Sequence, residues 1–271
     1  MAMDERARVL PSCYYILRLV IISTSATEEY QMVRDVPLTA IIPVRGGSKG
    51  IPRKNLYKFM GETLLERTIG FSKACSRIDD VYVTTDDHEM QRIARSSGAK
   101  APFLRPALLA GDDAPTIDAV KHLLSKVGIN KGYVVLLQVT SPLRECHDLQ
   151  QICSEFEANP EAKSVVSVVR HVEPHPEKML QVRDGYLGSY FGGNPSAPRQ
   201  TLPEVYALNG AFYLSSVEGI MSQNSIWGHR SMPYIMPPER SVNIDSDLDI
   251  VLLEALAAWG RVKPETYCIG N

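Results

Sequence analysis

Basic residues and glycines are concentrated in one short segment of the chain. Residues 43–55 read PVRGGSKGIPRKN, so two adjacent glycines lie close to Arg45, Lys49, Arg53 and Lys54. Adjacent glycines let the backbone turn tightly and bring N–H groups near an anion, and the cations neutralise phosphate charge. The spacing does not fit GxxxxGK[ST], because the first lysine precedes the last glycine, and the glycines do not have the GxGxxG spacing either. The pattern favours a phosphate-binding loop of another kind, and the competing interpretation is a solvated basic turn.

Acidic residues alternate with other types near the end of the chain, where residues 243–249 read NIDSDLD. Mg²⁺ prefers oxygen ligands and usually binds through one or two carboxylates together with substrate phosphates. We therefore predict Asp245 as a Mg²⁺ ligand and Asp247 as a second candidate. The competing interpretation is helix capping, in which Ser246 or Asp245 caps the next helix while Asp247 and Asp249 interact favourably with its dipole.

Other reactive side chains carry weaker signals. His171 and His175 lie in an irregular proline-rich stretch, a poor setting for the fixed geometry of a zinc site. Ser141 has no GxSxG context, which argues against a hydrolase nucleophile. Five cysteines form no CxxC pair, and their scattered positions, 13, 75, 146, 153 and 268, predict isolated reduced thiols rather than a disulfide framework or metal site.

Apolar runs alternate with amphipathic segments from residue 38 onward, and these elements must position the reactive residues. Buried strands are expected at residues 38–44, 81–85, 133–138, 164–169 and 207–214, with a further one within 227–236. Helices are expected at residues 63–75, 88–97, 116–127, 148–156 and 248–259. This alternation predicts a three-layer α/β/α fold with a mostly parallel central sheet. Ligands bind beyond the carboxyl ends of such strands, so the loops after residues 44, 85 and 138 should line one site.

Composition limits the number of domains and the classes of partner. The 271 residues are 44% apolar, and 29 basic and 31 acidic residues give a net charge of −2. This balance provides no field for nucleic acid or an anionic membrane. The apolar run at residues 14–22 is interrupted by Arg18 and is too short to cross a bilayer.

The same pattern divides the chain into three parts. We expect an N-terminal extension of unknown role at residues 1–36, a single domain at residues 37–262 and a C-terminal tail at residues 263–271. Residues 171–206 interrupt the strand and helix alternation and are rich in proline and glycine. A segment of that length inside a domain is usually functional, so we expect an interaction arm there.

Five segments taken together resemble one enzyme family. They are residues 43–55, LLQVTSPLR at 136–144, PRQTLP at 198–203, NGAFY at 209–213 and the acidic turn at 244–245. In this order, over about residues 38–258, they look like the N-acylneuraminate cytidylyltransferases. The resemblance implies a Rossmann-like nucleotidyltransferase fold and the reaction of CTP with a nine-carbon 2-keto sugar acid to give a CMP-sugar and pyrophosphate. It also implies Mg²⁺ as cofactor and a homodimer, and the scattered cysteines favour a reducing, cytoplasmic location.

The resemblance further implies roles for individual residues. The nucleotide would be held by Arg45, Ser48, Lys49, Lys54, Asn55, Arg105 and Thr116, and the last of these is also expected to cap its helix. Arg45, Lys49, Lys54 and Asp245 would act in catalysis. The sugar would be contacted by Gln138, Ser141, Arg144, Lys178, Arg199 and Asn209. The segment 171–206 would pack against a second subunit, with Lys178 or Arg199 reaching the partner's site.

Two departures from the family pattern leave alternatives open. Many relatives have Asp-Ile-Asp where this chain has Asn243 before Asp245, and an asparagine offers an oxygen without charge. In addition, no basic residue shortly precedes Asn209, as it does in some sialic acid enzymes. Legionaminic or pseudaminic acid as substrate, GTP in place of CTP, and a catalytically impaired nucleotide-binding protein therefore remain as alternatives.

Overall fold

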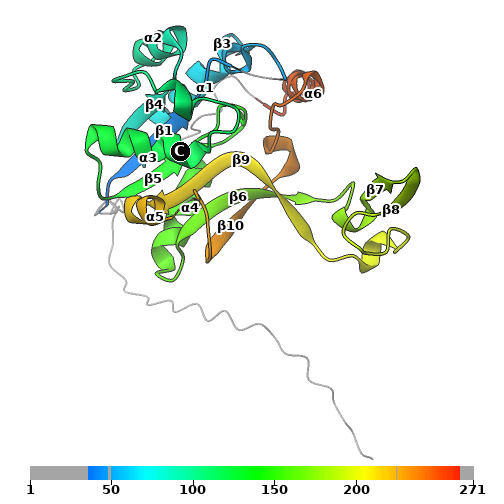
Figure 1. Ribbon diagram of the computed structural model, residues 1–271. Helices are drawn as coiled ribbons and strands as arrows, with labels where there is room; N and C mark the ends of the chain where they lie inside the picture. The colour runs from blue at the N-terminus through cyan, green and yellow to red at the C-terminus, as the bar shows by residue number, and fades with distance from the viewer. Residues whose placement is uncertain (1–35, 48–49, 224, 263–271) are drawn as a thin grey trace, which may run out of the picture. The chain divides into compact units, whose positions relative to one another are not determined.

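A computed structural model describes residues 36–47, 50–223 and 225–262. Its six-stranded sheet has the strand order β10-β6-β9-β5-β1-β4 (Figure 1). The strands are β1 (Leu38–Pro43), β4 (Asp80–Thr84), β5 (Tyr133–Leu136), β6 (Ser164–His171), β9 (Val205–Ser216) and β10 (Ser231–Met236). β1 is parallel to β4 and β5, and β10 is parallel to β6. The predicted mostly parallel sheet is confirmed, with β9 antiparallel to both of its neighbours.

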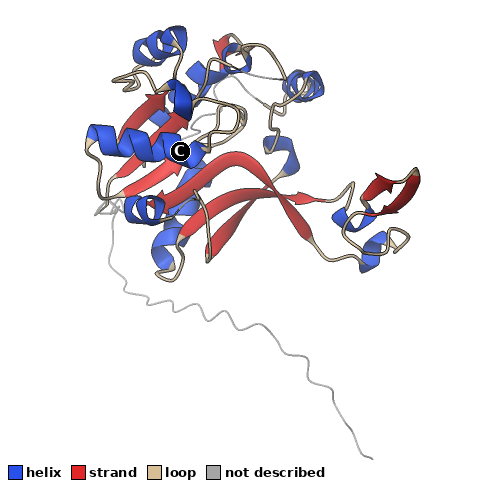
Figure 2. Cartoon of the chain, in the orientation of Figure 1, coloured by secondary structure: helices blue, strands red, loops and turns tan. Residues whose placement is uncertain are grey.

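Among the described residues, every α-helix except the short one at residues 217–222 matches a segment predicted from apolar periodicity (Figure 2). They are α1 (Leu64–Ala74), α2 (His88–Ser96), α3 (Thr116–Val127), α4 (Cys146–Ala158), α5 (Val217–Ser222) and α6 (Asp247–Ala258). α4 begins two residues before the expected start, because Glu145 and Asp148 form a capping box. The expectation that Thr116 caps α3 is wrong, since Pro115 occupies the cap position and Thr116 is the first helical residue.

Two apolar clusters lie on opposite faces of the sheet. Ala40 and Ile42 of β1 belong to a cluster that includes residues of α1, α2, α4 and α6. Ile41, between them, belongs to the other cluster, together with α3 and α5. Because successive side chains of a strand point to opposite faces, this division confirms the predicted three-layer α/β/α arrangement.

An excursion of residues 172–204 connects β6 to β9. It contains the hairpin of β7 (Leu180–Arg183) and β8 (Tyr186–Ser189), with the short helices η3 (Pro176–Lys178) and η4 (Arg199–Thr201). In Figure 1 the hairpin stands apart from the six-stranded sheet. The remaining short elements are η1 (Lys54–Leu56), β2 (Lys58–Phe59), β3 (Glu62–Thr63), η2 (Ala107–Leu109) and η5 (Pro238–Arg240).

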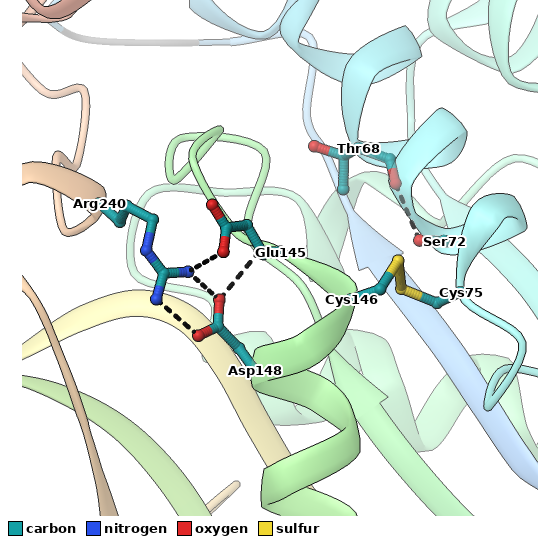
Figure 3. The surroundings of a disulfide bond; sticks show 7 residues. All are labelled: Thr68, Ser72, Cys75, Glu145, Cys146, Asp148 and Arg240. Carbon is teal, nitrogen blue, oxygen red and sulfur yellow. Dashed lines mark hydrogen bonds and ion pairs between the residues drawn. A yellow bond between two sulfur atoms is a disulfide. The ribbon is translucent and has the colours of Figure 1, made fainter. Parts of the chain in front are cut away.

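A disulfide joins Cys75, the residue that ends α1, to Cys146, the first residue of α4 (Figure 3). The expectation of isolated reduced thiols is therefore wrong for this pair. The two Cα atoms are 5.3 Å apart, within the range that a disulfide requires. The cysteines are 71 residues apart in sequence, so no local motif marks them, and packing of α1 and α4 against one face of the sheet brings them together. Cys153 is buried on α4, and Cys13 and Cys268 lie outside the described residues.

Within the described part of the chain, no helix is long and apolar enough to cross a membrane. The expectations for residues 1–35 and for the tail at 263–271 lie outside the described residues.

Candidate active site

A cavity of about 320 Å³ opens at the carboxyl ends of β1 and β5. Small-molecule sites commonly have volumes of this order. Residues of the loop after β1, the segment before α3 and the loop after β5 line it: Pro43, Val44, Arg45, Gly47, Lys54, Asn55, Arg105, Leu109, Ala110, Gly111, Asp112, Ala114, Thr116, Ala119, Gln138, Val139 and Thr140. The predicted loops after residues 44 and 138 therefore meet at one cavity.

The loop after β1 is held in shape by polar contacts from its neighbours. The Gly46 N–H donates to a carboxylate oxygen of Asp86 at 3.1 Å, so the loop after β4 also reaches this site. A side chain at Gly46 would come within 3.0 Å of Asp87, which explains the glycine. The buried Asn55 side chain donates to the Arg45 carbonyl at 3.0 Å and thereby fixes the loop backbone. Ser48 and Lys49 lie outside the described residues.

Three cations of the described residues line the cavity, and each has a partner within the chain. Arg45 forms an ion pair with Asp112 at 2.8 Å. Lys54 forms one with Asp245 at 2.7 Å. Arg105 is buried and donates to the Val44 carbonyl at 2.9 Å. Burial lowers the pKa of Arg105, and the nearby carboxylate of Asp86 opposes that shift.

The acidic turn before α6 lies against the loop after β1. One oxygen of Asp245 accepts from Lys54, and the other accepts from the Asn243 amide at 2.8 Å. A side chain at Gly50 would come within 2.5 Å of the Asp245 carbonyl, so glycine permits the close approach. The Asp245 side chain keeps 68% of its surface exposed. Two segments that are 191 residues apart in sequence thus form one charged junction.

Capping explains part of the acidic turn. Ser246 and Asp249 form a capping box, in which one Asp249 oxygen accepts from the backbone of Asp245 and Ser246 and from the Ser246 hydroxyl. Burial alone would raise the pKa of Asp249, but the hydrogen bonds lower it overall. Asp245 is not the cap, and Asp247 is the exposed first residue of α6.

The predicted sugar-side residues divide into exposed and buried groups. Gln138 lines the cavity. The buried Ser141 hydroxyl donates to the Asn209 carbonyl at 2.7 Å. The Asn209 amide accepts from the Ser167 hydroxyl at 2.6 Å and donates to the Ser241 hydroxyl at 3.0 Å, so its polar atoms bind protein groups. Gly210 has φ +74° and lies so close to Gln138 and Ser141 that a larger residue would clash with both.

Arg144 lies behind this turn rather than in the cavity. The side chain is 3% exposed, and it donates to the Gln138 carbonyl and, at 3.5 Å, to the Thr68 hydroxyl. Burial, followed by repulsion from Arg67, lowers the pKa of Arg144 to about 9. The structure therefore gives Arg144 a supporting position instead of the predicted direct contact with a sugar.

Lys178 and Arg199 belong to η3 and η4 of the excursion. Neither residue lines the cavity formed by the described residues, and the excursion lies away from the sheet in Figure 1. Their predicted contact with a sugar stays a prediction. His175, in the same segment, is buried, and its ring nitrogens bond to the Pro203 carbonyl and the Glu177 N–H.

Asp86 and Asp112 were not identified as site residues from the sequence. Asp86 directly follows an expected strand, so the rule on carboxyl ends of strands could have included it. Asp112 lies in an irregular segment whose approach to Arg45 has no local sequence signal.

Comparison with known proteins gives the family. A protein-family model described as cytidylyltransferase matches residues 39–188. The N-acylneuraminate cytidylyltransferase of Streptococcus agalactiae is 32% identical over 214 residues, which cover 78% of this chain and 51% of that protein. The chain therefore spans about half the length of such relatives. The pseudaminic acid cytidylyltransferase of Campylobacter jejuni is 27% identical, over 80% of this chain and 94% of that protein.

A solved structure agrees on the fold. The structure of a CMP:2-keto-3-deoxy-manno-octonic acid synthetase complexed with CTP superposes with a TM-score of 0.61 at 16% identity, covering 83% of this chain and 99% of that one. At this identity the likeness concerns the fold alone. The family match extends over more than half of the 271 residues and contains the loop after β1 and the turn after β5. The chain belongs to the cytidylyltransferase family.

Proposed function

We propose that the protein transfers a cytidylyl group from CTP to a nine-carbon 2-keto sugar acid of the N-acylneuraminate type and releases pyrophosphate. The observation that carries this proposal is the junction of Lys54 and Asp245 at the edge of a cavity lined by Arg45 and Arg105. A phosphate-binding loop, an exposed carboxylate and a cavity of suitable size meet there. The sugar class rests on relatives that match this chain over about four fifths of its length.

The chemistry requires positioning and charge neutralisation more than covalent help. The anomeric hydroxyl of the sugar acid gives up its proton to solvent water as its oxygen attacks the α-phosphorus in line, the bond from that phosphorus to the bridging oxygen breaks, and pyrophosphate leaves with the electrons of that bond. Arg45, Lys49 and Lys54 would neutralise the triphosphate, and Ser48 and Asn55 are proposed as further nucleotide-binding residues. Arg105, with Thr116 at the start of α3, would contact the cytidine.

Mg²⁺ fits the residues present. Asp245 is an exposed carboxylate beside the loop after β1, and Asp247, two residues later, is exposed as well. Among the described residues, no group of three or more His, Cys, Asp or Glu side chains could hold a metal. Mg²⁺ usually takes only one or two protein carboxylates and completes its shell with phosphates and water. We propose that Asp245, assisted by Asp247, holds Mg²⁺, which would neutralise charge on the triphosphate.

The sugar side is proposed to need a second copy of the chain. Apolar side chains of the hairpin are strongly exposed, among them Val182, Tyr186 and Leu187 at 70% or more. α6, which follows the acidic turn, exposes an apolar stripe of Leu248, Val251, Leu252 and Trp259. Exposed apolar patches of this kind mark interaction surfaces. We propose that a homodimer covers them and that Lys178 or Arg199 then completes the partner's site.

We propose the cytoplasm as the compartment, since the reaction consumes CTP. The disulfide of Cys75 and Cys146 is unusual for a reducing compartment. Thiol labelling of the protein directly after rapid acid quenching of cells would reveal which redox state the pair has there.

A substrate panel tests the function. Pyrophosphate release is measured with each of the four nucleoside triphosphates and with N-acetylneuraminic, legionaminic and pseudaminic acids, each with and without Mg²⁺. We expect release that requires CTP, one nine-carbon acid and Mg²⁺ together. Release with GTP alone would overturn the choice of nucleotide. Absence of release with every pair, from protein that still binds CTP, would identify a nucleotide-binding protein without catalysis.

A further inference from the structure

The turn of residues 138–142, which connects β5 to α4, is the point where the parts of the site meet. Gln138, Val139 and Thr140 line the cavity. The Thr140 carbonyl accepts from the Ile244 N–H of the acidic turn at 2.8 Å, and the Ser141 hydroxyl donates to β9. The position of this turn therefore sets how the cavity, the acidic turn and β9 lie relative to one another.

Two arginines bind the two ends of the turn from inside the protein. Arg67 of α1 donates from Nε to the Pro142 carbonyl at 3.2 Å. Arg144 donates from Nη2 to the Gln138 carbonyl and from Nη1 to Thr68 of α1. These side chains are 2% and 3% exposed, respectively, so neither can contact a substrate in the cavity directly.

Three aromatic rings lie beside the two guanidinium groups, and the Asp148 carboxylate is near enough to Arg144 to oppose the lowering of its pKa. Arg67 lies 5.3 Å from the centre of the Phe59 ring, and Arg144 lies 5.6 Å from that of Phe71 and 5.9 Å from that of Phe212. Burying a cation in such surroundings is unfavourable, and an apolar side chain of similar volume often gives an equally stable or more stable core. Both arginines also direct hydrogen bonds to the turn, which an apolar side chain of similar volume could not provide.

We propose that Arg67 and Arg144 are positioning residues that hold the turn of residues 138–142 in the geometry required for cytidylyl transfer. The proposal rests on the function proposed above. The arginines act through the backbone: they fix the Gln138 and Pro142 carbonyls, and thereby aim the Gln138 side chain and keep the Thr140 carbonyl against the acidic turn. An error of about 1 Å in such a site can reduce turnover about a hundredfold.

The test compares Arg67→Met, Arg144→Met and Arg144→Lys with Arg77→Met as a matched control. Arg77 also has a buried Nε, but it follows α1 at its far end and bonds to Glu157 instead of the turn. Amide hydrogen exchange is measured at Ser141 and Ile244, whose N–H groups bond to the Gln138 and Thr140 carbonyls. Thermal unfolding and the kcat and KM values of both substrates are measured on the same samples.

We expect exchange at Ser141 and Ile244 to become about tenfold faster or more in the Arg144→Met and Arg67→Met variants, because loss of the bonds lets the turn open locally. Their kcat should fall about tenfold to a hundredfold, out of proportion to any change in melting temperature. Arg144→Lys should recover part of the kcat, because the amine can still donate one bond to the Gln138 carbonyl. Arg77→Met should leave both the exchange and kcat unchanged.

Unchanged exchange in both methionine variants would overturn the proposal, and so would the same acceleration in Arg77→Met. If Arg144→Met does not fold, Arg67→Met and Arg144→Lys decide the question. The exchange comparison needs no turnover. If the wild-type protein is inactive with every substrate pair, the proposed function is refuted. The exchange measurements still decide whether the two arginines position the turn.

Discussion

The loop after β1 and the excursion between β6 and β9 both carry cations predicted to bind substrate, but only the cations of the loop lie at the cavity. In the loop region, Arg45, Lys54 and Arg105 border one cavity, and each bonds to a group of the same chain. In the excursion, Lys178 and Arg199 lie outside the lining of that cavity, beside strongly exposed apolar side chains. These positions agree with the proposal that a single chain forms the nucleotide half of the site and that a second copy completes the sugar half.

Two kinds of substrate recognition follow from this difference: one by a preformed cavity and one by an arm. Contacts that a preformed cavity makes with a nucleotide require little reordering and depend on residues of one chain. Contacts made by an arm depend on association with another chain, so they vary with protein concentration. Variants in the two regions should therefore fail in different ways.

The largest effect is expected from Lys54→Ala. Removing a cation that neutralises charge in the transition state should lower kcat about a hundredfold to a thousandfold. The pair with the exposed Asp245 contributes only about 0–1 kcal/mol to the free energy of unfolding, so the melting temperature should change little. Steady-state pyrophosphate release and thermal unfolding measure the two effects. A clear loss of stability with normal turnover would mean that Lys54 serves the fold alone.

A smaller effect is expected from variants of the acidic turn. There Asp245 is the proposed metal ligand and Asp249 belongs to the capping box, so substituting each residue tests metal binding and capping separately. Asp245→Asn should lower Mg²⁺-dependent turnover about tenfold to a hundredfold with little change in stability. Asp249→Asn should instead lower the free energy of unfolding by about 1 kcal/mol, because it removes one side of the capping box. Asn243→Asp should retain or raise turnover. Mg²⁺ titrations of turnover and urea unfolding distinguish these outcomes, and equal small effects from Asp245→Asn and Asn243→Asp would reduce the turn to a helix cap.

The smallest effect on turnover is expected from the disulfide. The double variant Cys75→Ser, Cys146→Ser should lower the free energy of unfolding by about 2–4 kcal/mol, because the bond closes a long loop in the unfolded chain. Turnover of the folded protein should change by less than about twofold, because neither cysteine belongs to the described residues that line the cavity. Wild-type protein treated with a reductant should behave like the double variant, and a reductant should not affect the double variant itself. Equal stability of oxidised and reduced wild-type protein would contradict this expectation.

The sequence predicts the positions of helices and strands well, but it predicts strand direction and long-range pairing less well. Apolar periodicity places β1, α1 and α3 to within a residue or two, because burial on a sheet imposes that pattern. The same pattern does not distinguish a parallel from an antiparallel strand, so the direction of β9 was not predicted. Distant cysteines carry no signal of their pairing.

For the candidate site, too, the sequence predicts which residues are involved better than it predicts where their side chains point. Gln138, Arg45 and Asp245 were identified by their residue types and their places after strands or before a helix, and the structure places the first two in the lining of the cavity. Arg144 belongs to the same motif as Gln138, but its side chain points into the protein. A motif fixes the order of residues, whereas packing decides which side chains face the cavity.

We propose that one chain supplies the nucleotide half of each site and that a second copy supplies the arm of residues 172–204. The most direct test is a heterodimer of Lys54→Ala and Arg199→Ala chains, isolated through two different affinity tags. Each variant homodimer should be nearly inactive. The heterodimer has one intact site if the arm acts across the dimer, so it should show about half of the wild-type turnover. Turnover no higher than that of the two variant homodimers, or full activity of the Arg199→Ala homodimer, would contradict the account.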